Sequence, residues 1–300
     1  MLFRSQGAQK GLELCIQTVI PSLFPFFVVS ILLTDSLSGR EVSMLKPICR
    51  FCQMPSGAEC LLVVGLLGGY PVGAKCVYDA WKRGQLTTAD AKRCLGFCSN
   101  AGPAFLFGMC STLFSKPWTA WILWCIHIVS ALLVGNLLPG KESSQMRSSI
   151  AAKVALSDAM AKAISAMLSV CGWVVLFRVI ITFCQRWFLW LLPTNLSIVI
   201  EGALELANGC VGLRAVESEG LRFILCAAFL GLGGLCVGLQ TISVVSELGS
   251  GMYFPGKVLQ CAISCSLASL FVSLKYHSFS PLLPAITTIL LILLAVIKKE

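Results

Sequence analysis

The sequence predicts an all-α fold, a polytopic integral membrane bundle of about eight or nine spans. Of the 300 residues, 57% are hydrophobic and 12% are charged, whereas roughly 25% of residues are charged in an ordinary soluble domain. Several apolar stretches reach the ~20 residues that a helix needs to cross hydrocarbon. Gly- and Pro-rich interruptions recur inside such stretches in both halves of the chain, which predicts broken or re-entrant helices.

The first span lies near the N-terminus, in "GLELCIQTVIPSLFPFFVVSILL" (11–33). Basic residues precede this apolar run, as in a signal peptide. The run is long, however, and lacks a small-x-small cleavage site, so we interpret it as a retained span. The clearest later spans cover residues 117–138, 223–245 and 279–297.

A polar stretch divides the chain near its middle. The sequence "PGKESSQMRSSIAAK" carries the helix-breaking and basic residues of a loop. We therefore expect an N-terminal half over 1–138, a polar linker over 139–157 and a C-terminal half over 158–300. Together they form one membrane domain.

The two halves show signs of an internal repeat. "GGYPVGAK" (68–75) aligns with "GGLCVGLQ" (233–240), and "PSLFPFFVV" (21–29) aligns more loosely with "GWVVLFRVI" (172–180). Paired interruptions are typical of transporter-type sites, although glycine is common enough in membrane helices to align by chance. If residues 187–209 cross the membrane, there are nine spans and the Gly-rich elements point in opposite directions. If they re-enter, there are eight spans and the Gly-rich elements point in the same direction.

The charge pattern indicates a lipid environment. The formal net charge is +9, but the basic residues are scattered over loops such as "WKRGQLTTADAKR". We therefore expect the lipid bilayer as a partner and no nucleic acid. We expect the N-terminus in the cytoplasm, because that placement puts Lys82, Arg83, Lys92, Arg93 and the central linker there.

Cysteine usage and motifs favour a protein that is not an enzyme. Most of the 16 cysteines lie in apolar segments, where a reduced thiol packs as a small hydrophobe. Only Cys49 and Cys52 have a CxxC spacing, and the two histidines are His127 and His277, so we expect no metal site and no cofactor. No Walker loop, HExxH or GxSxG pattern occurs, and we predict no catalytic residues.

The stretch "GLLGGYPVGAKC" (65–76) places helix breakers inside an apolar run. Pro71 lacks a backbone donor, and Gly68, Gly69 and Gly73 permit unusual torsions, so we expect a break. Freed backbone groups are tolerated in hydrocarbon only where protein or a cavity satisfies them, and they offer amides to a polar ligand. The alternative is that these glycines only let helices pack tightly.

Two charges fall inside apolar stretches. Lys75 either anchors a ligand or pairs with an acidic side chain, or it reaches the interface with its long stem. Arg178 poses the same choice, and structural pairing or snorkelling is the favoured interpretation.

Two further clusters complete the candidate site. "CSNAGPAFLFG" (98–108) predicts a second interrupted helix, in which Asn100 suits a hydroxyl or a base edge or joins helices. In "EGALELANG" (201–209), Glu205 binds a cation or sugar hydroxyls or neutralises Lys75, or else both glutamates are solvated at the interface. The candidate substrate-binding residues are Gly68, Gly69, Tyr70, Pro71, Gly73, Lys75, Ser99, Asn100, Gly102, Pro103, Glu205, Asn208 and Gln240.

These motifs resemble the sporulation integral membrane protein family of the nucleoside-recognition, or gate-domain, group. The resemblance covers nearly the whole chain and rests on "PSLFPFF", "GGYPVGAK", "SNAGPAFLFG", "ELANG" and "GGLCVGLQ". In the second motif, the matching residues are Gly69, Tyr70, Pro71, Gly73, Ala74 and Lys75. Ala207, Cys236 and Gly238 depart from the residues common in the family.

The resemblance implies nucleoside recognition, by distant similarity to concentrative nucleoside transporters, and a role in endospore formation. One hypothesis is a transporter-like or permeation protein whose broken helices converge on a midplane site for a small polar solute such as a nucleoside. The other is a non-transporting structural membrane protein that sporulation requires. The expected location is the bacterial cytoplasmic or forespore-related membrane, and the candidate protein partners are a second copy and sporulation membrane proteins.

Overall fold

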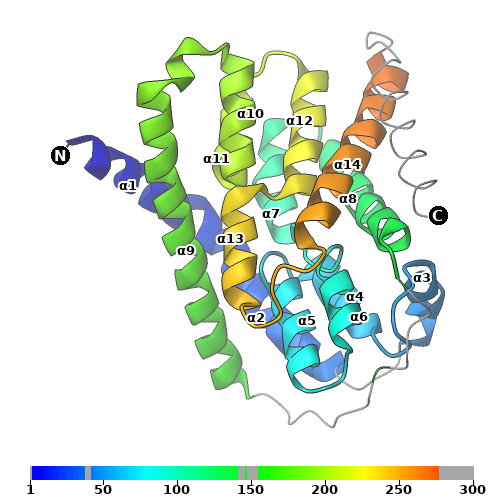
Figure 1. Cartoon of the computed structure of the whole chain (residues 1–300). Helices are drawn as coiled ribbons and strands as arrows, with labels where there is room; N and C mark the ends of the chain where they lie inside the picture. The colour runs from blue at the N-terminus through cyan, green and yellow to red at the C-terminus, as the bar shows by residue number, and fades with distance from the viewer. Residues whose placement is uncertain (1, 38–41, 141–145, 147–154, 277–300) are drawn as a thin grey trace.

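The computed structural model describes residues 2–37, 42–140, 146 and 155–276, and the regular structure in these ranges is helical (Figure 1). The all-α membrane fold class is confirmed. The helices that are long and apolar enough to cross a membrane number five in these ranges, in place of eight or nine, and the span expected over 279–297 lies outside them. The five cover Gln6–Leu32, Trp118–Leu137, Leu156–Trp187, Glu219–Val244 and Tyr253–Lys275.

The first span is one continuous helix built from three segments. They are α1 (Leu2–Leu14), the π-helical turn η1 (Cys15–Val19) and α2 (Ile20–Leu37). This helix packs along α9 (Leu156–Trp187), the 32-residue helix that opens the second half. The two helices form one wall of the molecule, on the left of Figure 1.

Two short helices fold back on each other in each half. We call α4 (Glu59–Leu67) and α5 (Val72–Lys82) hairpin 1, and α10 (Thr194–Leu204) and α11 (Leu206–Gly212) hairpin 2. We call the line along which the two helices of a hairpin touch its seam, and glycines lie on both seams. A Cβ on Gly73 would lie 2.9 Å from the Gly65 Cα, and a Cβ on Gly209 would overlap the Gly202 Cα. Each hairpin is therefore one rigid unit whose backbones touch.

An interrupted helix follows each hairpin, and a straight helix follows that. In the first half, α6 (Thr88–Cys94) leads through residues 95–102 to α7 (Pro103–Gly108), and in the second half α12 (Glu219–Leu232) meets α13 (Gly234–Val244) at a break. The straight helices are α8 (Trp118–Leu137) and α14 (Tyr253–Tyr276). The remaining segments are η2 (Ser43–Leu45), α3 (Lys46–Phe51), η3 (Cys110–Leu113), η4 (Leu189–Leu191) and η5 (Leu213–Ala215).

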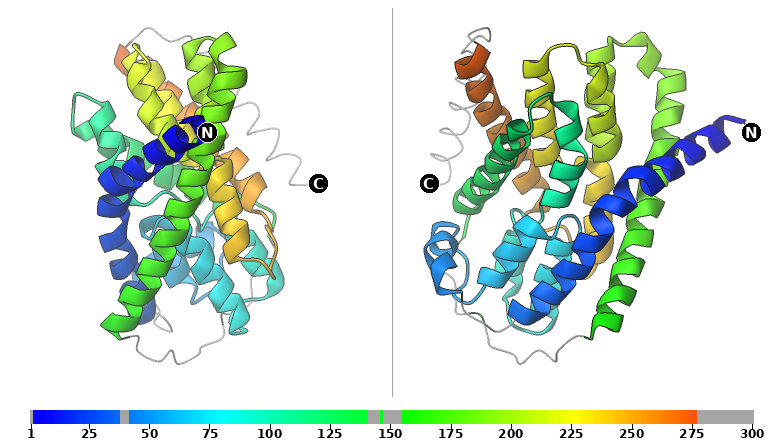
Figure 2. Two further views of the ribbon diagram at one scale, coloured as in Figure 1. Left: turned by 90° about the vertical axis from the view of Figure 1, so that its left-hand side faces the viewer. Right: turned by 180° about the vertical axis from the view of Figure 1, so that it is seen from behind.

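The hairpins enter the bundle from opposite ends, as Figures 1 and 2 show. Hairpin 1 lies at the lower end in Figure 1 and hairpin 2 at the upper end, while α6–α7 rises and α12–α13 descends. Residues 187–209 therefore form no single helix long enough to cross a membrane, because the chain turns back at Glu205 after the short apolar helix α10. The orientation expected of the two halves relative to each other stays a prediction.

The structure places one pair of the aligned sequence segments in matching elements and the other pair in different elements. Residues 21–29 and 172–180 both lie in the first helix of their half, as expected. Residues 68–75 belong to hairpin 1, however, whereas residues 233–240 belong to the interrupted helix that follows hairpin 2. The two aligned glycine motifs therefore occupy different kinds of element.

The basic loops lie at the end opposite the N-terminus. The chain begins in the upper half of Figure 1, whereas α5, which ends at Lys82, and α6, which carries Lys92 and Arg93, lie in the lower half. The cytoplasmic location expected for the N-terminus and for these basic residues stays a prediction.

A surface carboxylate joins the two halves at this lower end. The Tyr78 hydroxyl donates to Glu247 at 3.1 Å, and Lys82 forms an ion pair with the same side chain. The Lys82 ammonium holds the pKa of the Glu247 carboxyl below its ordinary value. Because both charged groups are exposed, the pair orients the loop more than it stabilises the fold.

We expect Gly73→Ala to destabilise the protein. The new Cβ would meet the carbonyl oxygen of Cys98 and the Cα of Gly65, which are backbone atoms that cannot swing aside. Overpacking of this kind costs about 1–3 kcal/mol, so the midpoint of thermal unfolding in detergent should fall.

Gly172→Ala in α9 is the matched control. No atom lies within 4 Å of a Cβ at this position, and alanine is favoured over glycine inside a helix by about 1 kcal/mol. Its unfolding midpoint should stay level or rise. Equal midpoints for the two variants would contradict the glycine seam of hairpin 1.

Candidate functional site

A small cavity lies where both hairpin tips and both interruptions meet. Its volume is about 50 Å³. The first helix and α9 supply apolar walls through Val19, Leu23, Val170 and Val174. Five of the residues predicted from sequence also line it, and these are Gly69, Tyr70, Gly102, Glu205 and Gln240.

The tip of hairpin 1 is a glycine turn that seats on the first interruption. Gly69 has φ +77°, a left-handed conformation that glycine adopts without strain. A Cβ on Gly102 would lie 3.1 Å from both the N and the Cα of Gly69, so the two backbones are in direct contact. The predicted break in "GGYPVGAK" is therefore present, and it packs against the predicted break in "CSNAGPAFLFG".

The tip of hairpin 2 is closed by a carboxylate. Glu205 is 3% exposed and caps α11 by accepting hydrogen bonds from the backbone N of Ala207 at 3.0 Å and of Asn208 at 2.6 Å. The side-chain amide of Asn208 also donates to Glu205 and in turn accepts from Arg178 at 3.0 Å. Asn208 thus links the buried carboxyl of Glu205 to the α9 guanidinium by hydrogen bonds, which confirms structural pairing for Arg178.

Tyr70 links the hairpin 1 tip to the second interruption. Gly233 and Gly234 have φ values of +76° and +82° at the break between α12 and α13. The Tyr70 hydroxyl donates at 3.4 Å to the carbonyl of Leu230, one of the acceptors that the end of α12 leaves without an intrahelical partner. One side chain therefore connects interruptions that belong to different halves of the chain.

A fully buried lysine lies directly behind this cavity. Lys257 on α14 is 1% exposed and donates to the Gln260 side-chain oxygen at 2.7 Å and the Asn100 side-chain oxygen at 3.3 Å. Its Nζ also lies 5.2 Å from the centroid of the Tyr70 ring, within reach of a cation–π interaction. Among the residues that the structure describes, no carboxylate forms an ion pair with Lys257.

Asn100 is the centre of this polar cluster. Its Nδ2 donates to the carbonyls of Gly65 at 3.1 Å and Phe97 at 2.7 Å, and its Oδ1 accepts from Lys257 and from Gln260 at 3.0 Å. All of its hydrogen-bonding capacity is used. Asn100 therefore holds hairpin 1, the first interruption and α14 together, and it does not face the cavity.

The structure leaves several predicted residues outside the cavity. Lys75 is half exposed and pairs with Asp79 on the same helix, so it neither faces the cavity nor meets Glu205. Gly73 belongs to the hairpin seam, Pro103 starts α7, and Asn208 supports Glu205. Gly68, Pro71 and Ser99 are buried beside the breaks and do not line the cavity.

Two other expectations concern charges. Glu201 accepts a hydrogen bond from Gln185 at 2.6 Å and is 8% exposed, so the expectation that both glutamates are solvated at the interface is wrong.

Lys257 and Gln260 were missed by sequence reasoning. The available signal was a lysine within the apolar run "KVLQCAISCSLASLF", three residues before a glutamine and hence on the same helix face.

The cavity is too small for a nucleoside in this conformation. Sites for small molecules usually enclose about 300–1,000 Å³, against about 50 Å³ here. A polar groove of about 540 Å³ opens further along the same elements and is lined by Lys10, Gln17, Met109 and Arg214. Its lining also includes Gly108 of α7 and Val211 of α11.

Fold and site define a multi-pass membrane protein in which two inward hairpins and two interrupted helices surround one central cavity. The chain is similar to the sporulation integral membrane protein YlbJ of Bacillus subtilis (strain 168), with 26% identity over 291 residues that cover 81% of this chain and 70% of that protein. The chain is thus homologous to a sporulation integral membrane protein, which confirms the resemblance seen in its motifs. No protein-family profile matches the chain, and no solved structure matches it.

The polar cluster predicts an asymmetry between two substitutions. Asn100→Ala leaves the buried Lys257 with one amide acceptor and should destabilise the protein by about 1.5–3 kcal/mol, the usual contribution of a hydrogen bond to a charged group. Lys257→Met removes the charge and keeps the volume, so its effect should be smaller or even stabilising.

Thermal unfolding of the two purified variants checks this asymmetry. Asn100→Ala should show much the lower midpoint, and the double variant should recover part of the loss. A greater loss for Lys257→Met would mean that the ammonium supports the fold more than its desolvation costs.

Proposed function

We propose that the protein is a transporter-like permeation protein that moves a small polar solute, with nucleosides as the first class to test, across a membrane involved in sporulation. The observation that carries this proposal is the convergence of both hairpin tips and both interrupted helices on one cavity. Broken helices that meet near the middle of a bundle are the usual construction of solute sites in transporters.

The arrangement of the halves supports the proposal. Each half consists of a long helix, a hairpin, an interrupted helix and a straight helix, and corresponding elements run in opposite directions (Figures 1 and 2). We interpret them as inverted repeats. In such folds, access alternates when one set of elements rocks against the other around a fixed site.

The cavity offers groups suited to a solute with hydroxyl and amide edges. Gln240 is 3% exposed and its side-chain amide both donates and accepts, while Glu205 supplies carboxylate oxygens. The small volume corresponds to a closed state. Since hairpin 2 borders both the cavity and the polar groove, its outward movement as a rigid unit would join the two spaces and admit a solute.

Uptake into proteoliposomes tests the proposal. Radiolabelled nucleosides and other small polar metabolites should enter with saturable kinetics, and Gln240→Leu should lower the initial rate roughly tenfold, the effect of about 1.4 kcal/mol of lost interaction. Lys75→Ala is the matched control and should transport normally, because Lys75 lies outside the cavity.

A second function is favoured by the closed cavity itself. A structural membrane protein that sporulation needs would use the glycine seams and the Asn100 cluster for packing alone, and it would have no use for a larger space. Absence of uptake and binding across the solute panel, with Gln240→Leu behaving as the parent protein does, would support this second function and refute transport.

A further inference from the structure

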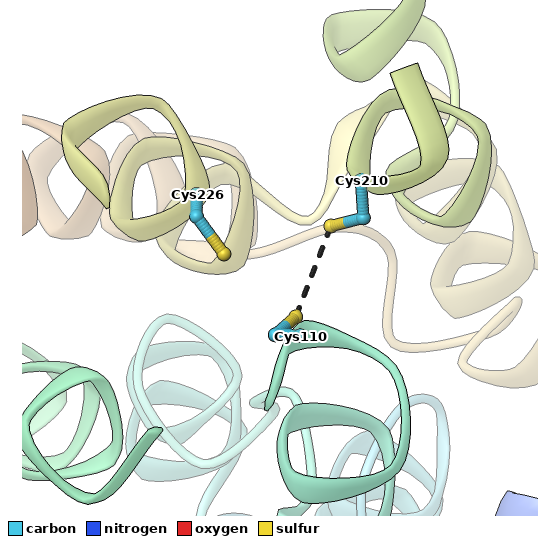
Figure 3. A group of neighbouring side chains, drawn as sticks. All are labelled: Cys110, Cys210 and Cys226. Carbon is cyan, nitrogen blue, oxygen red and sulfur yellow. Dashed lines mark hydrogen bonds between the residues drawn. The ribbon is translucent and has the colours of Figure 1, made fainter. Parts of the chain in front are cut away.

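Three cysteines from distant parts of the chain meet in the core beside hairpin 2. Cys110 opens η3, Cys210 lies on α11 and Cys226 lies on α12, and each is 0% exposed. Figure 3 shows the three side chains directed toward a common point. The Sγ atoms of Cys110 and Cys210 are 3.9 Å apart, and all three Sγ atoms lie within 4.8 Å of one another.

This spacing fits one metal ion bound by three sulfurs. With a metal–sulfur distance of about 2.3 Å, a trigonal planar site places its sulfurs about 4.0 Å apart, close to the 3.9 Å between Cys110 and Cys210. Elsewhere in the described part of the chain, no further group of three His, Cys, Asp or Glu side chains converges in this way.

The chemistry of the ligand set selects the ion. Thiolates are soft ligands that favour Cu(I) and zinc. Zinc requires four ligands in a closed structural site, whereas the described residues supply three sulfurs within an apolar core that includes Leu106, Leu213 and Leu230. We propose that Cys110, Cys210 and Cys226 form a binding site for one Cu(I) ion.

A cation and a groove next to the cluster support this assignment. Arg222 lies one turn before Cys226 on α12 and donates to the carbonyls of Leu113 at 2.8 Å and Val216 at 2.6 Å. Its charge offsets part of the negative charge that the thiols gain when they release their protons to solvent and bind the ion. Met109 and Val211, the sequence neighbours of Cys110 and Cys210, line the polar groove, which gives the ion a route inward.

The bound ion would fasten hairpin 2 to the rest of the bundle. It would join α11 to α12 and to η3, whose positions otherwise depend on side-chain packing and on the hydrogen bonds of Arg222. The metal site is independent of the proposed function. The further consequence, that Cu(I) slows opening by immobilising hairpin 2, rests on that proposed function.

Anaerobic titration of the full-length protein in detergent tests the site. Cu(I) is supplied as its bicinchoninate complex, and transfer of the ion is followed by the loss of that complex's absorbance. We expect one equivalent to bind, with affinity reduced at least 100-fold in each of Cys110→Ala, Cys210→Ala and Cys226→Ala. Cys60→Ala in α4, another buried cysteine, and Cys125→Ala, an exposed one, should bind as the parent protein does.

X-ray absorption on the copper-loaded parent protein gives a result that does not depend on how the variants fold. Three sulfur neighbours in the first shell are expected. Two sulfurs, nitrogen or oxygen neighbours, no transfer from bicinchoninate, or equal losses in Cys60→Ala would each overturn the proposal. Proteoliposome uptake separates the two inferences, because failure of copper to bind leaves solute uptake unaffected.

Discussion

The structure depends on finding partners for the backbone groups that helix breaks release inside an apolar protein. An unpaired buried amide or carbonyl costs about as much as a lost hydrogen bond, and no water is available in hydrocarbon to satisfy it. Here the breaks satisfy one another. Asn100 bonds the Gly65 carbonyl, Tyr70 bonds the Leu230 carbonyl, and Glu205 accepts from the amides that begin α11. The four interruptions therefore have to lie together in the middle of the bundle.

Glycine makes this convergence possible in two ways. Positive φ at Gly69, Gly233 and Gly234 lets the chain turn sharply at the tips and breaks. Gly65 against Gly73, and Gly202 against Gly209, let the two helices of each hairpin touch through their backbones. A hairpin without side chains along its seam is stiff and narrow. It can enter the bundle and move as one body while its tip keeps its shape.

The two halves treat buried charge differently. In the second half, Asn208 connects the Glu205 side chain to the Arg178 guanidinium by hydrogen bonds, so the acidic group at the tip of hairpin 2 belongs to a network that includes a cation. Behind hairpin 1, Lys257 is surrounded by amide oxygens and an aromatic ring in place of a carboxylate. Desolvation makes such a lysine costly. A charge kept under these conditions is typical of a functional site, and the cavity lies beside it.

The sequence by itself determined the membrane class, the breaks at residues 68–71, 99–102 and 233–234, and the candidate roles of Tyr70, Glu205 and Gln240. These features depend on local chemistry, since apolar length, glycine torsions and proline act within a few residues of where they occur. Only the tertiary structure decided that both pairs of short helices fold back as hairpins, that Lys75 faces away, that Lys257 completes the Asn100 cluster and that three distant cysteines meet. Such contacts depend on the direction in which each helix crosses the bundle. That direction is set by packing between segments more than a hundred residues apart, and no local pattern records it.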